Sequence, residues 1–122
     1  MNTLFYIGAG LTALWGIAHL FPTKNVVRDF GDISEDNKNI ITMEWIVEGV
    51  ALIFIGVLVS MVTIIDSTSP VSNAVYWLAF GTLNVLSLIS LFTGFKVNFT
   101  PFKLCPVIFT GSSILILLGL LL

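Results

Sequence analysis

Four long apolar stretches dominate this sequence and constrain what it can fold into. They cover residues 3–21, 40–65, 74–95 and 106–122. An α-helix needs about 20 predominantly apolar residues to cross the roughly 30 Å hydrocarbon core of a bilayer. Three of the stretches contain no Asp, Glu, Lys or Arg, and the second contains only two glutamates. The sequence therefore predicts an all-α polytopic membrane protein, a single domain over residues 1–122 that forms a bundle of four transmembrane helices.

The composition supports the same class. Hydrophobic residues make up 57% of the chain and charged residues only 10%, whereas soluble domains contain about 25% charged residues. Five Lys or Arg and seven Asp or Glu are too few to cover a soluble surface, so the lipid bilayer is the expected partner. The net charge of −2, without a run of Lys or Arg, argues against nucleic acid. A single cysteine, Cys105, excludes an internal disulfide and a CxxC redox or zinc motif.

The basic residues are distributed asymmetrically. All five fall in two predicted loops on the same side of the membrane, residues 22–39 and 96–105. Cytoplasmic loops carry the excess of Lys and Arg, so we expect both termini to be extracytoplasmic. We predict a multi-pass protein located in the bacterial inner (plasma) membrane. The five basic residues are Lys24, Arg28, Lys38, Lys96 and Lys103.

The loop over residues 22–39 contains a pattern typical of an interfacial helix. Its apolar residues recur at helical spacing: Val26, Val27, Phe30 and Ile33. Ser34 resembles a helix N-cap, and Glu35 and Asp36 follow it in what would be the first turn. The second long helix is therefore predicted to begin near Glu35, with about 31 residues and a length of roughly 46 Å.

Three ionisable residues within the predicted spans are candidates for a proton or ligand site: His19, Glu44 and Glu48. Such groups cost on the order of 2.5 to 3.5 kcal/mol at the centre of a membrane helix and are usually functional. The glutamates are four residues apart, so they share one helix face, and Glu48 lies about 6 Å deeper. His19 lies at the same end of the first helix, where it can pair with either glutamate. No catalytic residue is identified.

Two other interpretations of these residues remain open. His19 and Glu44 can reach the lipid headgroups, with Trp15 and Trp45 in an aromatic belt at that level. One histidine with two carboxylates is also a weak metal-site pattern, and we predict no metal. Short helices without large loops offer no site for a nucleotide or soluble redox cofactor, so no cofactor is expected.

Small and polar residues within the spans predict how the helices pack. Gly8 and Gly16 in the first helix, and Gly49 and Gly56 in the second, are spaced to allow close helix approach. Asn84 lies midway along the third helix, where its amide needs a partner in the apolar interior. We expect it to join neighbouring helices.

The end of the first predicted helix, residues 16–22 with the sequence GIAHLFP, together with four helices and compact loops, resembles the DoxX-like small bacterial membrane proteins. The resemblance extends over the chain in architecture and is confined to this stretch at the level of residues. It implies a four-helix bundle. Some members of that family are associated with membrane oxidoreductase systems and many have no assigned activity, so it implies no catalytic residue here.

Three functional hypotheses follow. The first is an accessory or interaction protein that acts through its helices on lipid, on other membrane proteins or on further copies of itself, and is not an enzyme. The second is a proton-coupled transporter of a small or lipophilic molecule that uses Glu48. The third is a membrane enzyme acting on a lipophilic substrate such as a quinone, with His19 and Glu44 or Glu48 exchanging protons. The sequence leaves the substrate and oligomeric state open.

Overall fold

The computed structural model describes residues 2–94, 96–98 and 100–122. These residues form five α-helices, and no strand occurs among them, which confirms the all-α prediction. Four of the helices, α1, α3, α4 and α5, are long and apolar enough to cross a membrane. The helices are α1 (Asn2–Leu20), α2 (Thr23–Asp29), α3 (Glu35–Asp66), α4 (Pro70–Gly94) and α5 (Thr100–Leu121).

Two helix starts illustrate how local chemistry sets the boundaries. The Ser34 hydroxyl accepts a hydrogen bond of 3.2 Å from the Asn37 N–H, and α3 begins at Glu35 as the N-cap pattern predicts. The fourth span was predicted from residue 106, but α5 begins at Thr100 and Pro106 lies inside it. A proline removes the hydrogen bond to the carbonyl four residues earlier, and its ring crowds that carbonyl, but α5 nevertheless continues through Pro106.

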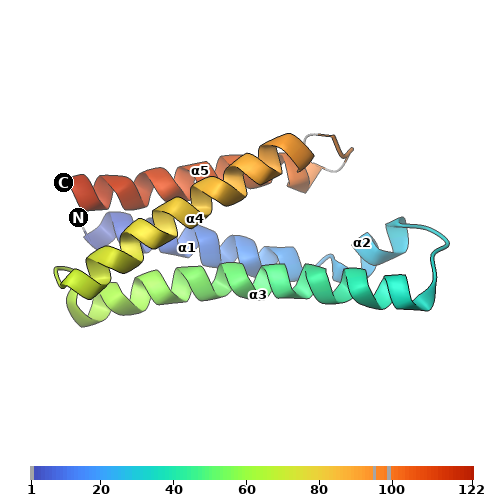
Figure 1. Ribbon diagram of the computed structural model, residues 1–122, viewed down its shortest axis with the longest axis horizontal. Coiled ribbons are helices and arrows are strands. Elements are labelled where there is room, and N and C mark those ends of the chain that lie inside the picture. The colour runs from blue at the N-terminus through green and yellow to red at the C-terminus, as the bar shows by residue number, and fades with distance from the viewer. Residues whose placement is uncertain (1, 95, 99) are drawn as a thin grey trace.

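The long helices are arranged around α1. It packs along α3 on one side and along α5 on the other, and α4 packs mainly on α5 (Figure 1). Helix α4 meets α3 at one end of the molecule and diverges from it toward the other (Figure 1). Both termini lie at the end where α3 and α4 meet. The short helix α2 and the α4–α5 connection lie at the opposite end, where the bundle is more open.

Hydrogen bonds and ring stacking join the helices at the end of the bundle where both termini lie. The hydroxyls of Tyr76 in α4 and Thr63 in α3 are 2.8 Å apart. The Ser72 hydroxyl donates to the Val62 carbonyl at 3.2 Å. The ring of Phe5 in α1 stacks on Tyr76 with centroids 3.8 Å apart. These contacts join α1, α3 and α4 at this end, whereas α3 and α4 diverge toward the end where α2 lies (Figure 1).

The predicted packing glycines lie at helix contacts. A Cβ at Gly16 would approach the Gly49 carbonyl oxygen to 2.7 Å, and a Cβ at Gly56 would approach the Cβ of Ala13 to the same distance. The backbones of α1 and α3 therefore touch without intervening side chains. Gly8 makes the corresponding close contact with α5. This packing brings the end of α1 against the middle of α3.

Hydrogen bonding between α4 and α5 involves a different residue from the one predicted. The amide nitrogen of Asn84 donates to the Phe80 carbonyl at 2.7 Å, within α4 itself, so this bond joins no second helix. The Ser87 hydroxyl instead lies 2.6 Å from the Thr110 hydroxyl and donates to the Pro106 carbonyl at 3.2 Å. Short polar side chains can also bond back to the carbonyl four residues earlier, so the difference lies in position: Ser87 is buried at the contact with α5, where it meets Thr110.

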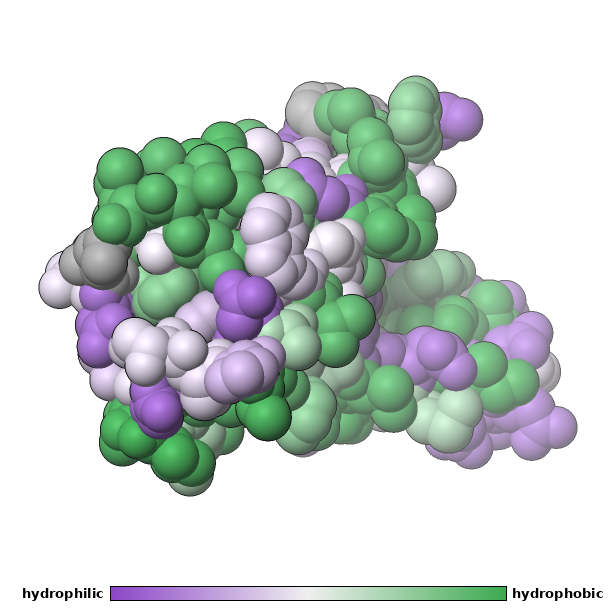
Figure 2. Space-filling view, turned by 60° about the vertical axis from the view of Figure 1, so that its left-hand side comes forward, coloured by the Kyte–Doolittle hydropathy of each residue, from purple (hydrophilic) through white to green (hydrophobic). Residues whose placement is uncertain are grey.

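The outer surface of the bundle is apolar. Figure 2 shows that hydrophobic residues cover most of the visible face, with hydrophilic residues gathered toward its ends. Large hydrophobic side chains are exposed on all four long helices, among them Leu14, Phe54, Leu78 and Val107. An apolar surface of this extent is what lipid covers in a membrane protein.

Candidate functional site

The structure brings His19 together with Glu48 at the α1–α3 contact. His19 lies in the last turn of α1 and is only 8% exposed. Its Nε2 atom is 3.4 Å from Oε2 of Glu48, and the two groups form an ion pair when the imidazole is protonated. This approach falls outside hydrogen-bond geometry, so Nε2 is buried without a hydrogen bond among the described residues. Glu44, the other predicted partner, lies one turn away on α3, about 6 Å closer to α2.

Trp45 fixes the position of His19. The two rings stack with centroids 3.9 Å apart and an interplanar angle of 15°. The indole N–H also donates to the His19 carbonyl at 2.7 Å, which satisfies one of the carbonyls left unpaired at the end of α1. The sequence placed Trp45 in an interfacial aromatic belt. Its contact with His19 depends on the register between α1 and α3, for which a single sequence carries no signal.

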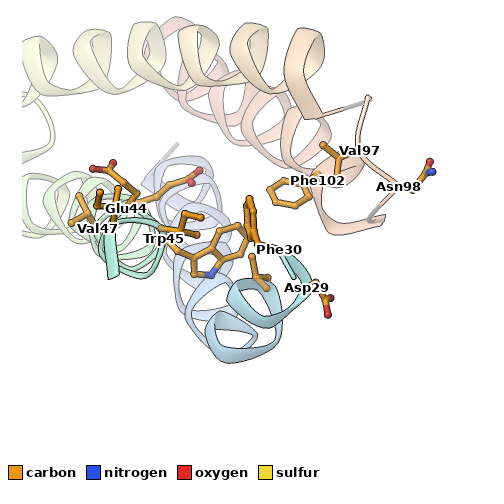
Figure 3. A pocket seen from close by; sticks show the side chains of 12 residues that line it. Asp29, Phe30, Glu44, Trp45, Val47, Val97, Asn98 and Phe102 are labelled. Atoms are coloured by element: carbon orange, nitrogen blue, oxygen red, sulfur yellow. The ribbon is translucent and has the colours of Figure 1, made fainter. Parts of the chain in front are cut away.

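A pocket of about 800 Å³ opens beside this pair. It lies between α2, α3 and the α4–α5 connection, at the end where α3 and α4 diverge (Figure 3). Three aromatic side chains gather around it, Phe30, Trp45 and Phe102, and the last two meet edge to face at 5.5 Å. We call this the acidic pocket because its polar lining residues are Asp29, Glu44, Glu48 and Asn98.

The charges of the acidic pocket have one sign. Glu44 and Glu48 both line it, and the Glu48 side chain remains 48% exposed although it contacts His19. Asp29 lies at the rim with its carboxylate pointing outward (Figure 3). No Lys or Arg occurs among the described residues that line the pocket. An apolar, aromatic pocket that is lined by carboxylates and by no basic side chain of the described residues attracts a ligand that combines a positive charge with an apolar body.

Polar atoms continue from the site into the bundle along α1 and α5. Trp15 Nε1 is buried without a hydrogen bond among the described residues, and its indole faces the thiol of Cys105, a weak acceptor. The Ser112 hydroxyl, farther along α5, is buried and likewise has no hydrogen-bond partner in the described part of the chain. The interior of the bundle therefore contains buried polar atoms at two levels, Trp15 near His19 and Ser112 near Gly8.

The three predicted site residues do not converge on one point. His19 and Glu48 are adjacent, while Glu44 faces the pocket one turn away. Within residues 2–94, 96–98 and 100–122, no three His, Cys, Asp or Glu side chains are grouped so that they hold a metal ion. The arrangement suits proton exchange and ligand binding at a carboxylate.

No protein-family model, no curated protein and no solved structure matches this chain. The resemblance to DoxX-like proteins stays a prediction. The function is therefore argued from the geometry of the acidic pocket.

Proposed function

We propose that this chain is a multi-pass integral membrane protein that binds a lipophilic cation in the acidic pocket, with Glu48 as the counter-ion. One observation carries the proposal. Glu44 and Glu48 share a pocket with three aromatic rings, and no basic side chain of the described residues lines it. The volume of about 800 Å³ falls within the range of pockets that enclose small organic ligands. Aromatic faces add cation–π attraction to the charge interaction.

Proton exchange follows from the contact between Glu48 and His19. A cation that approaches Glu48 competes for this carboxylate with protons and with the imidazole 3.4 Å away. At a pH where the pair of His19 and Glu48 holds a proton, binding of the cation displaces this proton. This is the binding step of proton-coupled transport, in which one carboxylate takes the ligand and the proton in turn.

The orientation of the protein belongs to the same proposal. The two termini lie at one end of the bundle (Figure 1). All five Lys and Arg residues lie in or next to the two connections at the other end, which join α1 to α3 and α4 to α5. By the positive-inside rule the end with the acidic pocket faces the cytoplasm and both termini are extracytoplasmic. In a bacterium we expect such a protein in the inner membrane.

Binding of tetraphenylphosphonium, a lipophilic cation, tests the proposal. The purified protein in lipid nanodiscs is titrated with this cation, and binding is followed by calorimetry and by quenching of tryptophan fluorescence. We expect Glu48→Gln to weaken binding at least tenfold. Glu35→Gln is the matched control, because Glu35 lies on the same helix with its side chain 83% exposed and outside the pocket. Equal affinities of Glu48→Gln and the unaltered protein would reject the proposal.

An accessory role is the competing proposal. It is supported by the apolar part of the lining, including Ile40 and Val47, against which a helix of a partner protein can pack. It predicts a protein that copurifies in fixed stoichiometry and blocks access of the cation to the pocket. An enzyme acting on a quinone has less support, because the charged lining residues of the pocket are carboxylates, and an ionised carboxylate cannot donate a hydrogen bond to a quinone carbonyl.

A further inference from the structure

A second pocket, of about 360 Å³, lies on the other face of α2. We call it the basic pocket, because its charged lining residues are Lys24 and Arg28 of α2 and Lys38 of α3. No Asp or Glu of the described residues lines it. Three of the five basic residues of the protein therefore surround one small depression. The remaining lining residues are Thr23, Val27, Gly31 and Thr42.

Helix α2 separates the two pockets and sorts the charges between them. The residues of this segment that line the acidic pocket are Val26, Asp29 and Phe30. Those that line the basic pocket are Thr23, Lys24, Val27, Arg28 and Gly31. Both sets follow the spacing of three and four residues that marks one face of a helix. The segment thus presents an acidic and aromatic face to one pocket and a basic face to the other.

We propose that the basic pocket binds the phosphate group of an anionic lipid headgroup. Lysine and arginine side chains that converge from two helices form the kind of site that holds lipid phosphates, and arginine adds bidentate hydrogen bonds. This lipid site is separate from the proposed cation site, and it requires only that the bundle is inserted into a membrane.

The depth of the pocket points to a lipid source for the phosphate. Thr42 and Lys38 precede Glu48 by six and ten residues on α3, so they lie about 9 and 15 Å farther out along the helix. This is the level of the headgroups if the pair of Glu48 and His19 marks the edge of the hydrocarbon core. Gly31, with a φ of +81°, has no side chain and no atom within 4 Å of its Cβ position, so it leaves the pocket open.

The cations of the basic pocket are available to a ligand. Lys38 Nζ is 3.2 Å from Glu35 Oε1, and Arg28 Nε is 3.9 Å from Asp29 Oδ1. All four side chains are at least 40% exposed, and ion pairs at such a surface contribute little. No carboxylate of the described residues forms an ion pair with Lys24. The two lining threonine hydroxyls already donate to backbone carbonyls, so the cations supply the attraction.

Native mass spectrometry of the full chain, titrated in detergent with phosphatidylglycerol, tests the proposal. We expect the affinity to fall about fivefold for each of Lys24→Gln, Arg28→Gln and Lys38→Gln, and roughly a hundredfold in the triple variant. The matched control is Lys96→Gln with Lys103→Gln, which removes basic charge at the same end outside the pocket. Circular dichroism checks that the variants keep their helices.

The outcomes separate the alternatives. An unchanged affinity in the triple variant, or an equal loss in the control, would overturn the assignment. An excess of inorganic phosphate is the second arm: we expect it to leave the lipid bound, because it lacks acyl chains. Complete displacement of the lipid by inorganic phosphate would identify a site for soluble phosphate and contradict the lipid headgroup. The triple variant keeps its affinity for tetraphenylphosphonium, so failure here is distinct from failure of the cation site.

Discussion

Replacement of Gly16 by alanine tests the contact that positions the candidate site. An alanine in a helix interior is more stable than glycine by about 0.5 to 1 kcal/mol. At Gly16, however, the new Cβ would lie 2.7 Å from the Gly49 carbonyl oxygen and 2.9 Å from the Ile53 backbone nitrogen. Both atoms belong to the backbone of α3, so relief requires α1 and α3 to separate. Overpacking of this kind costs about 1 to 3 kcal/mol, so after the gain from alanine we expect a net loss of up to about 2.5 kcal/mol.

Gly81→Ala is the matched control, since no atom lies within 4 Å of its Cβ position. We expect it to leave the free energy of unfolding unchanged or raise it by up to about 1 kcal/mol. Both variants are unfolded reversibly with dodecyl sulfate in mixed micelles and followed by circular dichroism. Gly16→Ala should also strengthen cation binding, because the imidazole of His19, which competes for Glu48, moves away from this carboxylate. Equal free energies of unfolding in the two variants would refute the close α1–α3 contact.

The same unfolding assay checks four further substitutions. Ser87→Ala removes the hydrogen bonds to α5 and should lower the free energy of unfolding by about 1 kcal/mol. Asn84→Ala breaks a bond within α4 and should lower it by less. The reverse order would contradict the assignment of Ser87 as the residue that joins α4 to α5. Tyr76→Phe keeps the ring stack, loses the bond to α3, and should cost about 0.5 to 1.5 kcal/mol. Trp45→Phe keeps a ring over His19 but loses the N–H donor, so we expect a similar decrease in the free energy of unfolding and weaker cation binding. If both quantities stay unchanged, Trp45 does not position His19.

Much of the helical architecture could be predicted from the sequence. Apolar runs of sufficient length identify the four long helices, because only a helix satisfies its own backbone groups in lipid. The Ser34 cap located the start of α3 within the loop. The start of α5 was misplaced because Pro106 was taken as a boundary, although the helix passes through it. The interfacial pattern of the loop extended to Ile33, but α2 ends at Asp29 and a left-handed Gly31 follows.

The candidate site could be predicted only in part. Burial cost singled out His19, Glu44 and Glu48, but the choice of partner for His19 depended on the register between α1 and α3. That register is set by backbone contact at Gly16 and Gly49, which brings Glu48 beside His19. The two faces of α2, one lining the acidic pocket and the other the basic pocket, could not be predicted either. The sequence shows which residues of this segment are charged, but not which neighbouring elements they face.

The central claim is that a cation and protons compete at Glu48, and the most direct test counts both in one titration. Tetraphenylphosphonium is added to the protein in weakly buffered solution, with cation binding measured by calorimetry and proton release by a pH electrode. The account predicts that protons leave as the cation binds, and that Glu48→Gln abolishes both events while Glu35→Gln preserves both. Cation binding without proton release, or proton release that persists in Glu48→Gln, would contradict it.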